Sequence, residues 1–456
     1  MTAMTQNHKD SSTSRRTFLR SSAAMLGATA LSPAIARGEV FSSAHPLFPK
    51  TPHFAPKAQR VIFFFMNGGA SHVDTFDPKP ALVKDAGKQI SSGRKLLPSP
   101  WKPNVYSQCG TQVTELFPHV GACMDDIALI RSMHGDHGDH FEATLGMHSG
   151  SNGEARPGIG AWLSFGLGTH NPNMPSHVVF AEKNPYGGAQ VWDSNFLRAY
   201  HHGVRVTPVS NPIPNFKSAV AASNLREMEM QMFEKLNAAH AAARPGDSKL
   251  SDRSLSFRTA RGLMQDAPDA FDITKESDAT LELYGVKRGD NKSFAWQCLM
   301  ARRMAERGVR FIEVIDGNNW DAHSNIKSHE SLSKNIDQPI AGLIRDLKSR
   351  GMLDSTLVVW CTEFGRTPHA PGGGRDHHKG AFSCWLAGGG AKGGVVHGTT
   401  DPYGIEIAEN PVHVHDFHAT ILHLVGIDHE RLTYHYGGRD FRLTDLYGNV
   451  VKSVVA

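Results

Sequence analysis

The sequence predicts an α/β fold: a three-layer sandwich in which a mostly parallel central sheet is covered by helices on both faces. Continuous apolar runs, such as residues 60–66 and 356–361, are typical of strands that are buried on both sides. Residues 309–361 contain strand, helix and strand with short connections, which is the βαβ unit of a parallel sheet. Polar clusters follow several of these runs, where parallel strands place ligand-binding loops.

The first 36 residues are expected to be an export signal. Arg15 and Arg16 form a twin-arginine motif before an apolar stretch, residues 22–33, and a small-residue cleavage site at 34–36. That stretch is too short for a permanent membrane span, and no later segment approaches the roughly 20 apolar residues that a span needs. We expect twin-arginine export to the periplasm or the exterior, with no integral membrane segment after signal removal; an uncleaved anchor is the alternative.

Charge gives no indication of a nucleic-acid partner. Loss of the signal removes four of the 48 Lys and Arg and one of the 44 Asp and Glu, which leaves 44 and 43. The mature protein is therefore nearly neutral, whereas a nucleic-acid-binding protein is expected to carry a basic face.

After an extended lead-in, residues 37–57, one domain is expected over 58–456. Its first strand is 60–66, and a second apolar run, 127–130, leads into the polar segment 133–140. The glycines that follow the first strand would let the backbone turn tightly or approach a ligand.

The middle of the chain is expected to form a helical insertion at about residues 215–307. Asn224 is expected to cap an amphipathic helix over 225–236. A second helix is expected to end at Gly308, before a strand at 309–315.

The clearest unit comes next. Apolar residues at helical spacing over 336–347 predict a helix that ends at Gly351, and a strand follows at 356–361. A last amphipathic helix is expected over 414–425, ending at Gly426.

The five cysteines form no CxxC motif. Cys361 and Cys384 lie in apolar runs and are expected to be buried. Cys109 and Cys123 could pair in an oxidising compartment, but an odd total leaves at least one free thiol.

Four polar clusters are the strongest indication of function. They are residues 320–323, 362–367, 375–379 and 387–390. Asp, Glu and His in the first three supply oxygen and imidazole ligands for a divalent cation, which predicts a metal site with hydrolytic chemistry. The alternative is chance proximity in a chain that has 26 histidines.

These segments also carry a family resemblance. Residues 354–360 resemble the late, ligand-bearing strand of the alkaline phosphatase and sulfatase superfamily, and 416–427 resemble the closing helix of the sulfatases. Within that superfamily the chain is most similar to the exported domain-of-unknown-function family 1501. The motifs concerned are Gly-Gly-Ala-Ser-His at 68–72, Asp-Thr-Phe-Asp-Pro-Lys-Pro at 74–80, Leu-Met-Ala-Arg-Arg at 299–303, Trp-Asp-Ala-His at 320–323, Thr-Glu-Phe-Gly-Arg-Thr-Pro at 362–368 and Gly-Gly-Arg-Asp-Phe at 437–441. The resemblance covers most of residues 60–447 and implies an alkaline-phosphatase-like fold.

The same resemblance implies a ligand set for one or two divalent metal ions, zinc before calcium or manganese. The candidates are Asp74, Asp321, His323, Glu363, Asp376, His377 and His378. The chain departs from the superfamily at Asn67, which stands where the first-strand Asp would be, so Asp74 is expected to reach back from the loop.

Three further residues are catalytic candidates. His140 is expected to orient the nucleophile or protonate the leaving group, and Arg366 is expected to bind the oxyanion. Thr144 is the candidate nucleophile. The alternatives are a loop-stapling hydrogen bond for His140, a salt bridge for Arg366 and a helix cap for Thr144. The Cys-x-Pro-Ser-Arg signature is absent from the sequence, so a formylglycine sulfatase is not expected.

The function implied is metal-dependent hydrolysis of phosphate, sulfate or related esters of a small molecule or polysaccharide. The competing hypothesis is an exported binding or assembly protein that keeps the fold without turnover. The missing first-strand Asp favours the second hypothesis, and the many ionisable groups near strand ends favour the first.

Overall fold

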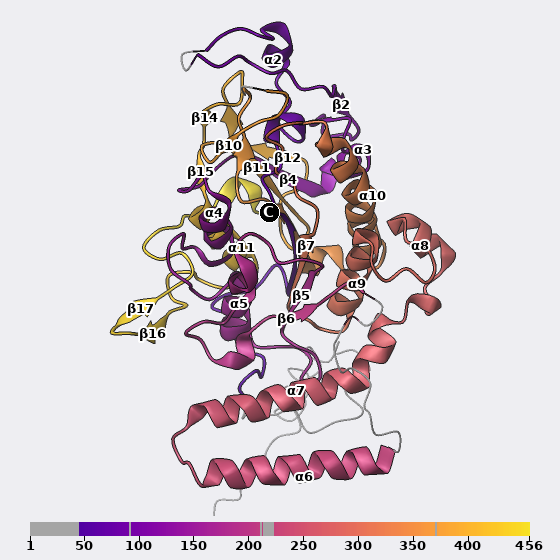
Figure 1. The fold of residues 1–456 in the computed structure, drawn as a ribbon, viewed down its shortest axis with the longest axis vertical. Helices are drawn as coiled ribbons and strands as arrows, with labels where there is room; N and C mark the ends of the chain where they lie inside the picture. Colours follow the sequence, from indigo (N-terminus) through magenta and orange to yellow (C-terminus); the bar gives the residue numbers. More distant parts are fainter. Residues whose placement is uncertain (1–44, 91–92, 210–211, 213–222, 370–371) are drawn as a thin grey trace, which may run out of the picture. The chain divides into compact units, whose positions relative to one another are not determined.

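A computed structural model of the chain describes residues 45–90, 93–209, 212, 223–369 and 372–456 (Figure 1). The chain divides into two units, Met1–His45 and Pro46–Ala456, and the description below concerns the second. The expected signal, together with most of the first unit, lies outside the described residues.

A nine-stranded sheet forms the centre of this unit, in the order β12-β4-β11-β8-β1-β7-β5-β6 with β15 beside β4. Its strands are β1 (Arg60–Met66), β4 (Ile127–His134), β5 (His177–Ala181), β6 (Val204–Val206), β7 (Phe311–Asp316), β8 (Thr356–Cys361), β11 (Phe382–Ala387), β12 (Val395–His397) and β15 (Val412–His413). Every pairing in it is parallel except the two that β11 makes with β4 and β8. The expected mostly parallel sheet is confirmed.

Strand β1 shows why the sheet forms from these residues. Its side chains alternate between two apolar cores, with Phe64 in one and Phe63 and Phe65 in the other, and all three are fully buried. Removal of one such side chain from water contributes about 2 kcal/mol. Because both faces are covered, the strand is apolar throughout, which is the pattern seen in the sequence.

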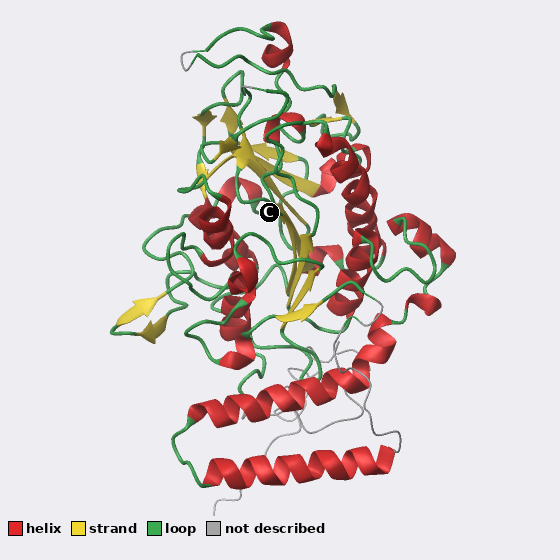
Figure 2. Cartoon of the chain, in the orientation of Figure 1, coloured by secondary structure: helices red, strands yellow, loops and turns green. Residues whose placement is uncertain are grey.

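Helices cover both faces of the sheet and complete the three layers (Figure 2). On one side lie α3 (Pro118–Gly121), α9 (Phe294–Glu306) and α10 (Ser328–Ser349). On the other lie α4 (His140–Ser149), α5 (Ile159–Leu167) and α11 (Val414–Leu424). The expected three-layer architecture is therefore confirmed.

The segment expected to be a helical insertion contains α6 (Ser223–Ala242), α7 (Ser248–Phe271), α8 (Asp278–Tyr284) and α9. Of these, α9 belongs to the layer over the sheet. Asp252 of α7 pairs with Arg198, which lies in the loop that precedes β6. The apolar stripe predicted for α6 is present, but its side chains are exposed.

Short elements make up the remainder. They are α2 (Pro80–Lys84), β2 (Pro103–Val105), β3 (Gln112–Thr114), β9 (Gly365–Arg366), β10 (His377–His378), β13 (Thr399–Thr400), β14 (Ile407–Glu409), β16 (Tyr434–Tyr436), β17 (Arg439–Phe441) and 3-10 turns at His72–Asp74, Met124–Asp126, Gly188–Trp192, Ala199–His201, Ile273–Lys275, Leu353–Ser355 and Lys452–Val454. No helix among the described residues has both the length and the apolar character needed to cross a bilayer.

Two sequence-based expectations need correction. The fourth polar cluster, residues 387–390, follows β11, which runs antiparallel to β8, so the cluster lies at the opposite edge of the sheet, where Gly389 donates to Leu353 O. The five cysteines are all free; Cys109 is exposed and Cys123 is buried, so the suggested pair does not form.

Candidate metal centre

Parallel strands bring the candidate residues to one edge of the sheet. The loop after β4 leads to His140, the first residue of α4. The loop after β7 carries Asp321, and the loop after β8 carries Glu363. The short antiparallel pair β9–β10 returns the chain to the same edge and delivers His377.

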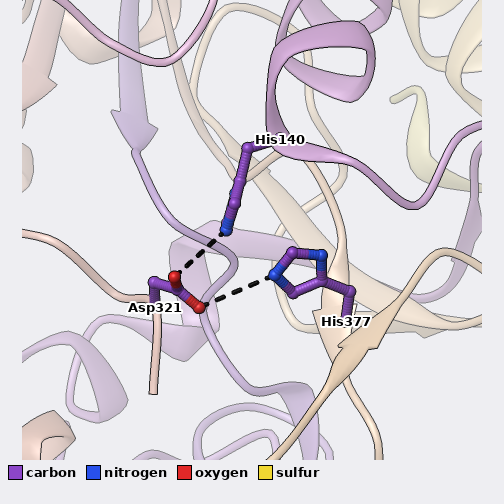
Figure 3. Close-up of side chains that lie close together, drawn as sticks. All are labelled: His140, Asp321 and His377. Atoms are coloured by element: carbon purple, nitrogen blue, oxygen red, sulfur yellow. Dashed lines mark ion pairs between the residues drawn. The ribbon is translucent and has the colours of Figure 1, made fainter. Parts of the chain in front are cut away.

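His140, Asp321 and His377 form the centre of the site (Figure 3). Each offers one ligand atom, and the three atoms lie within 4.8 Å of one another. The Nε2 atom of His140 is 3.5 Å from Asp321 Oδ2, and the Nε2 atom of His377 is 3.6 Å from Asp321 Oδ1. Asp321 thus lies between the two rings, with one oxygen toward each.

The other nitrogen of each ring is held by an acceptor. His140 Nδ1 lies 2.7 Å from Glu363 Oε1, and His377 Nδ1 lies 2.7 Å from Gly138 O. A carboxylate and a carbonyl oxygen only accept, so in the neutral rings both Nδ1 atoms carry the hydrogen. The Nε2 lone pairs therefore face Asp321, and His140 Nε2 is buried without a hydrogen-bond partner among the described residues. This arrangement is typical of metal-binding histidines.

His323 adds a third imidazole. Its Nε2 atom is 3.1 Å from Asp321 Oδ1 and 2.9 Å from His377 Nε2, and its Nδ1 atom is 3.3 Å from Asp376 Oδ1. With the hydrogen at Nδ1 in both rings, two lone pairs face each other at 2.9 Å, and they repel unless a proton or a cation lies between them. The His323 side chain is 45% exposed, so it forms the solvent side of the cluster.

Glu363 was expected to be a ligand, but its oxygens are used elsewhere. Oε1 accepts from Gly68 N at 2.8 Å as well as from His140, and Oε2 accepts from the Thr362 hydroxyl at 3.2 Å. The carboxylate is fully buried behind the His140 ring. Its position is that of a residue that orients a ligand, not of a ligand itself.

Arg366 also differs from its expected role. Its guanidinium donates to Asp321 Oδ1 at 2.7 Å, to Gly69 O at 3.0 Å, to Arg375 O at 3.2 Å and to Gly68 O. The side chain is fully buried, and burial lowers its pKa. With these donors committed, Arg366 orients Asp321 and does not face a substrate oxyanion.

Electrostatics keep Asp321 ionised. Burial alone would raise its pKa, but contacts with His140, His377 and Arg366 outweigh burial and hold the pKa well below its usual range. For His140, burial is likewise the largest single effect and lowers the pKa, whereas Asp321 and Glu363 together raise it above the ordinary histidine value. The negative charge of Asp321 therefore favours a positive charge at this centre, either a proton or a metal cation.

Two of the expected ligands lie outside the cluster. Asp74 is fully buried, and its two oxygens lie 2.6 and 3.1 Å from nitrogens of Arg375, so it does not reach back to the site. His378 turns to the other side of β10, where its Nε2 lies 2.7 Å from Ile405 O, and burial, followed by the nearby His72, lowers its pKa to about 4.

The last two candidates lie at the margin of the site. Asp376 contacts His323 through Oδ1 and Arg94 through Oδ2, at 2.9 Å, so it supports His323. Thr144 is fully buried one helical turn after His140, and its hydroxyl has no hydrogen-bond partner among the described residues. A hydroxyl without access to solvent does not suit the role of nucleophile.

Tyr186 is a contributor that the sequence analysis missed. Its ring stacks on that of His140, with centroids 3.9 Å apart and planes 9° apart. Phe364 packs against both His140 and His377, with centroids 4.8 and 4.5 Å away. The apolar run at 177–181, which forms β5, was the available signal, because Tyr186 lies in the loop at its carboxyl end.

The donor set fits zinc better than calcium. Zinc is bound by imidazole nitrogen and carboxylate oxygen in tetrahedral sites, whereas calcium takes six to eight oxygens. A second group, His137, Asp139 and Glu142, also has ligand atoms within 4.8 Å of one another, but Asp139 is exposed and the other two are partly so.

The chain matches one protein family and is similar to several solved structures. A family model described as "Protein of unknown function (DUF1501)" matches residues 58–455. No curated protein matches the chain.

Several solved structures are similar, at low identity. The lipoteichoic acid synthase LtaP from Listeria monocytogenes is 8% identical with a TM-score of 0.37, over 89% of this chain and 78% of that chain. The phosphonate monoester hydrolase SpPMH from Silicibacter pomeroyi is 11% identical with a TM-score of 0.35, over 81% and 73%. A protein in the alkaline phosphatase superfamily from Vibrio parahaemolyticus is 9% identical with a TM-score of 0.38, over 86% and 72%.

Proposed function

The chain belongs to the DUF1501 family of proteins of unknown function, and we propose that it is an exported, metal-dependent hydrolase of phosphate, sulfate or related esters. One observation supports this most: three imidazole nitrogens surround one carboxylate at the carboxyl edge of the sheet. Each ring is oriented by an acceptor at its other nitrogen, as in metal sites.

Zinc bound there would supply a Lewis acid that polarises an ester oxygen and lowers the pKa of a bound water. In this proposal the residues of the protein hold the zinc and orient its ligands. Asp321, His140 and His377 are the proposed ligands, which leaves the fourth position of a tetrahedral zinc to water. Glu363 and Gly138 O hold the Nδ1 hydrogens, Arg366 fixes Asp321, and His323 lies on the solvent side. His140 therefore acts in this proposal through ligation, not through the proton transfer that its position in the sequence suggested.

One observation favours the non-catalytic alternative. The arginine nearest to Asp321 has its donors committed to the protein, so it offers no ready partner for a substrate oxyanion. A binding or assembly protein that holds a structural metal would need no such partner.

Metal content and hydrolysis, measured on the same preparations, test the proposal. Asp321→Ala and His377→Ala should each lose bound zinc and lose hydrolysis of phosphomonoesters, phosphodiesters or sulfate esters together, because both lie at the centre of the donor set. His378→Ala is the matched control: it is the neighbour of His377, contacts Ile405 O instead, and should keep its zinc.

The outcomes separate the two candidates. Zinc-loaded wild-type protein that is inert toward all three ester classes would favour the binding protein. Full zinc occupancy in Asp321→Ala would show that the centre is not the metal site.

A further inference from the structure

A pocket lies beside the proposed centre. It has a volume of ~480 Å³ and is lined by, among others, Asn67, Lys183, Asn184, Tyr186, Asp316 and Asn319. This volume is in the range of small-molecule sites. These residues lie at the carboxyl ends of β1, β5 and β7, the same edge of the sheet as Asp321.

Two contacts join the pocket to the centre. The Tyr186 ring, which forms part of the pocket wall, stacks on His140 at 3.9 Å. Asn319 accepts from the backbone N–H of Asp321 at 3.0 Å and donates to the Tyr186 hydroxyl at 2.9 Å. Tyr186 and Asn319 therefore belong both to the lining of the pocket and to the support of the centre.

Two amide side chains in the lining offer donors because their oxygens are already used. The side-chain oxygen of Asn67 accepts from Tyr186 N at 3.1 Å, and that of Asn184 accepts from Arg205 at 2.9 Å. Among the described residues, neither of these amide NH₂ groups has an acceptor, and neither does the exposed Lys183 ammonium. The Tyr186 hydroxyl accepts from Asn319 and keeps its own hydrogen to donate.

The carboxylate of Asp316 also lines the pocket, but its oxygens already accept hydrogen bonds. Asp316 is buried, and its oxygens accept from Asn318 and from the indole N–H of Trp320 at 2.8 to 3.1 Å. Glu182 is the opposing charge at the rim, because its carboxylate lies 3.3 Å from where a Cβ on Gly317 would be. Lys183, Asn67 and Asn184 line the same pocket as Asp316.

We propose that this pocket binds a second anionic group of the substrate, a carboxylate, sulfate or phosphate, in addition to the ester at the metal centre. The inference rests on the proposed function and names its substrate class: esters of molecules that carry a further oxyanion. Charged acceptors suit a lining of ammonium, amide and phenol donors, since hydrogen bonds to ionised groups are the stronger ones.

A matched pair of probes tests this on the zinc-loaded full chain. 3-Carboxyphenyl phosphate and 3-carbamoylphenyl phosphate differ in charge but little in shape, and 3-sulfophenyl phosphate replaces the carboxylate by a sulfonate. Binding is measured by calorimetry and turnover by phosphate release. Wild-type protein should prefer both anionic probes to the neutral one by about tenfold in Kd and in KM.

Two variants should move that preference in opposite directions. Lys183→Ala should reduce it to about twofold or less, and Glu182→Gln should increase it by roughly two- to threefold because the opposing charge is gone. The matched control is Lys235→Ala on α6, an exposed lysine away from the pocket, which should leave the ratio unchanged.

Equal binding of charged and neutral probes, or an unaltered ratio in Lys183→Ala, would overturn the inference. The ratio of Kd values from calorimetry does not depend on turnover. A charge preference in binding without phosphate release would support the pocket assignment and contradict the hydrolase proposal. Phosphate release without a charge preference would support the hydrolase proposal and contradict the pocket assignment.

Discussion

At the scale of single residues, the centre repeats one arrangement three times. Each imidazole presents one nitrogen to an acceptor and the other to Asp321 or to a neighbouring ring. The acceptors differ: a buried carboxylate for His140, a carbonyl for His377 and a partly exposed carboxylate for His323. These acceptors place the hydrogen at Nδ1 in the neutral rings of His140 and His377, as in metal-binding histidines, whereas His323 has a carboxylate oxygen near each of its nitrogens.

We expect Glu363→Gln to weaken zinc binding by about tenfold or more, because a neutral amide orients the His140 ring less well and makes it a poorer donor. Competition with a chromogenic chelator measures the change. Glu229→Gln, on an exposed stretch of α6, serves as the control. An affinity equal to that of wild type would mean that Glu363 does not support the ligand.

The raised pKa of His140 predicts opposite pH slopes with and without zinc. In the metal-free protein its stabilising contribution is fully present below the unfolded value of 6.5 and is lost as pH rises through the folded pKa. Zinc needs the unprotonated ring, so zinc stabilises more as pH rises. The difference in Tm between zinc-bound and metal-free protein should grow from pH 6 to pH 8. A constant difference would contradict the assignment of His140 as a ligand.

At the scale of elements, one edge of the sheet carries the whole site because β1, β4, β5, β7 and β8 all point the same way. Their loops then have to pack closely. Gly68, after β1, has a φ of +114°, and a Cβ there would lie 2.3 Å from Asn319 Oδ1 and 2.7 Å from Asp321 N. Only glycine allows the first loop to pass so close to the ligand-bearing loop.

Gly68→Ala should therefore separate the two loops and remove zinc, with a loss of several kcal/mol in unfolding free energy from steric overlap with backbone. Gly87→Ala is the matched control, because Gly87 also has a positive φ of +78° but nothing lies within 4 Å of its Cβ position. The control should cost about 1 kcal/mol and keep its zinc. Calorimetric unfolding and metal analysis measure both effects; similar losses in the two variants would show that strain, not loop contact, matters at Gly68.

At the scale of the whole molecule, the export proposal concerns a part of the chain that the structure does not describe. It is supported by the twin arginines and the short apolar stretch that follows them. The described part, from residue 45 onward, contains no helix suited to span a membrane.

Replacement of both Arg15 and Arg16 by lysine should keep the protein in the cytoplasm, because the twin-arginine route recognises the paired guanidinium groups. Cell fractionation followed by immunoblotting measures the distribution. Arg20→Lys, which lies outside the pair, should be exported normally. Unchanged export of the double variant would remove the twin-arginine assignment.

The sequence by itself determined the framework on which the site is built. Strands β1 and β8 have the predicted bounds, α10 and α11 lie where apolar periodicity places them, and α9 ends just before Gly308, as expected. These elements depend on local patterns, since a strand buried on both faces and a helix buried on one must each show their burial in consecutive residues. Asp321 and His323 could be anticipated for the same reason, because they follow β7 closely, whereas His377 lies in β10, beyond β8 and β9.

Only the tertiary structure decided the role of each candidate. Asp74 is held by Arg375, which lies 301 residues away in the sequence, and His378 is turned away from His377 because successive strand residues face opposite sides. The role proposed for His140 as a ligand depends on Glu363, 223 residues distant, which takes the other nitrogen of the ring. The antiparallel direction of β11 likewise depends on its pairing with β4 and β8 in the sheet. Partners so far apart in the chain meet only through the order of strands in the sheet, and no local pattern encodes that order.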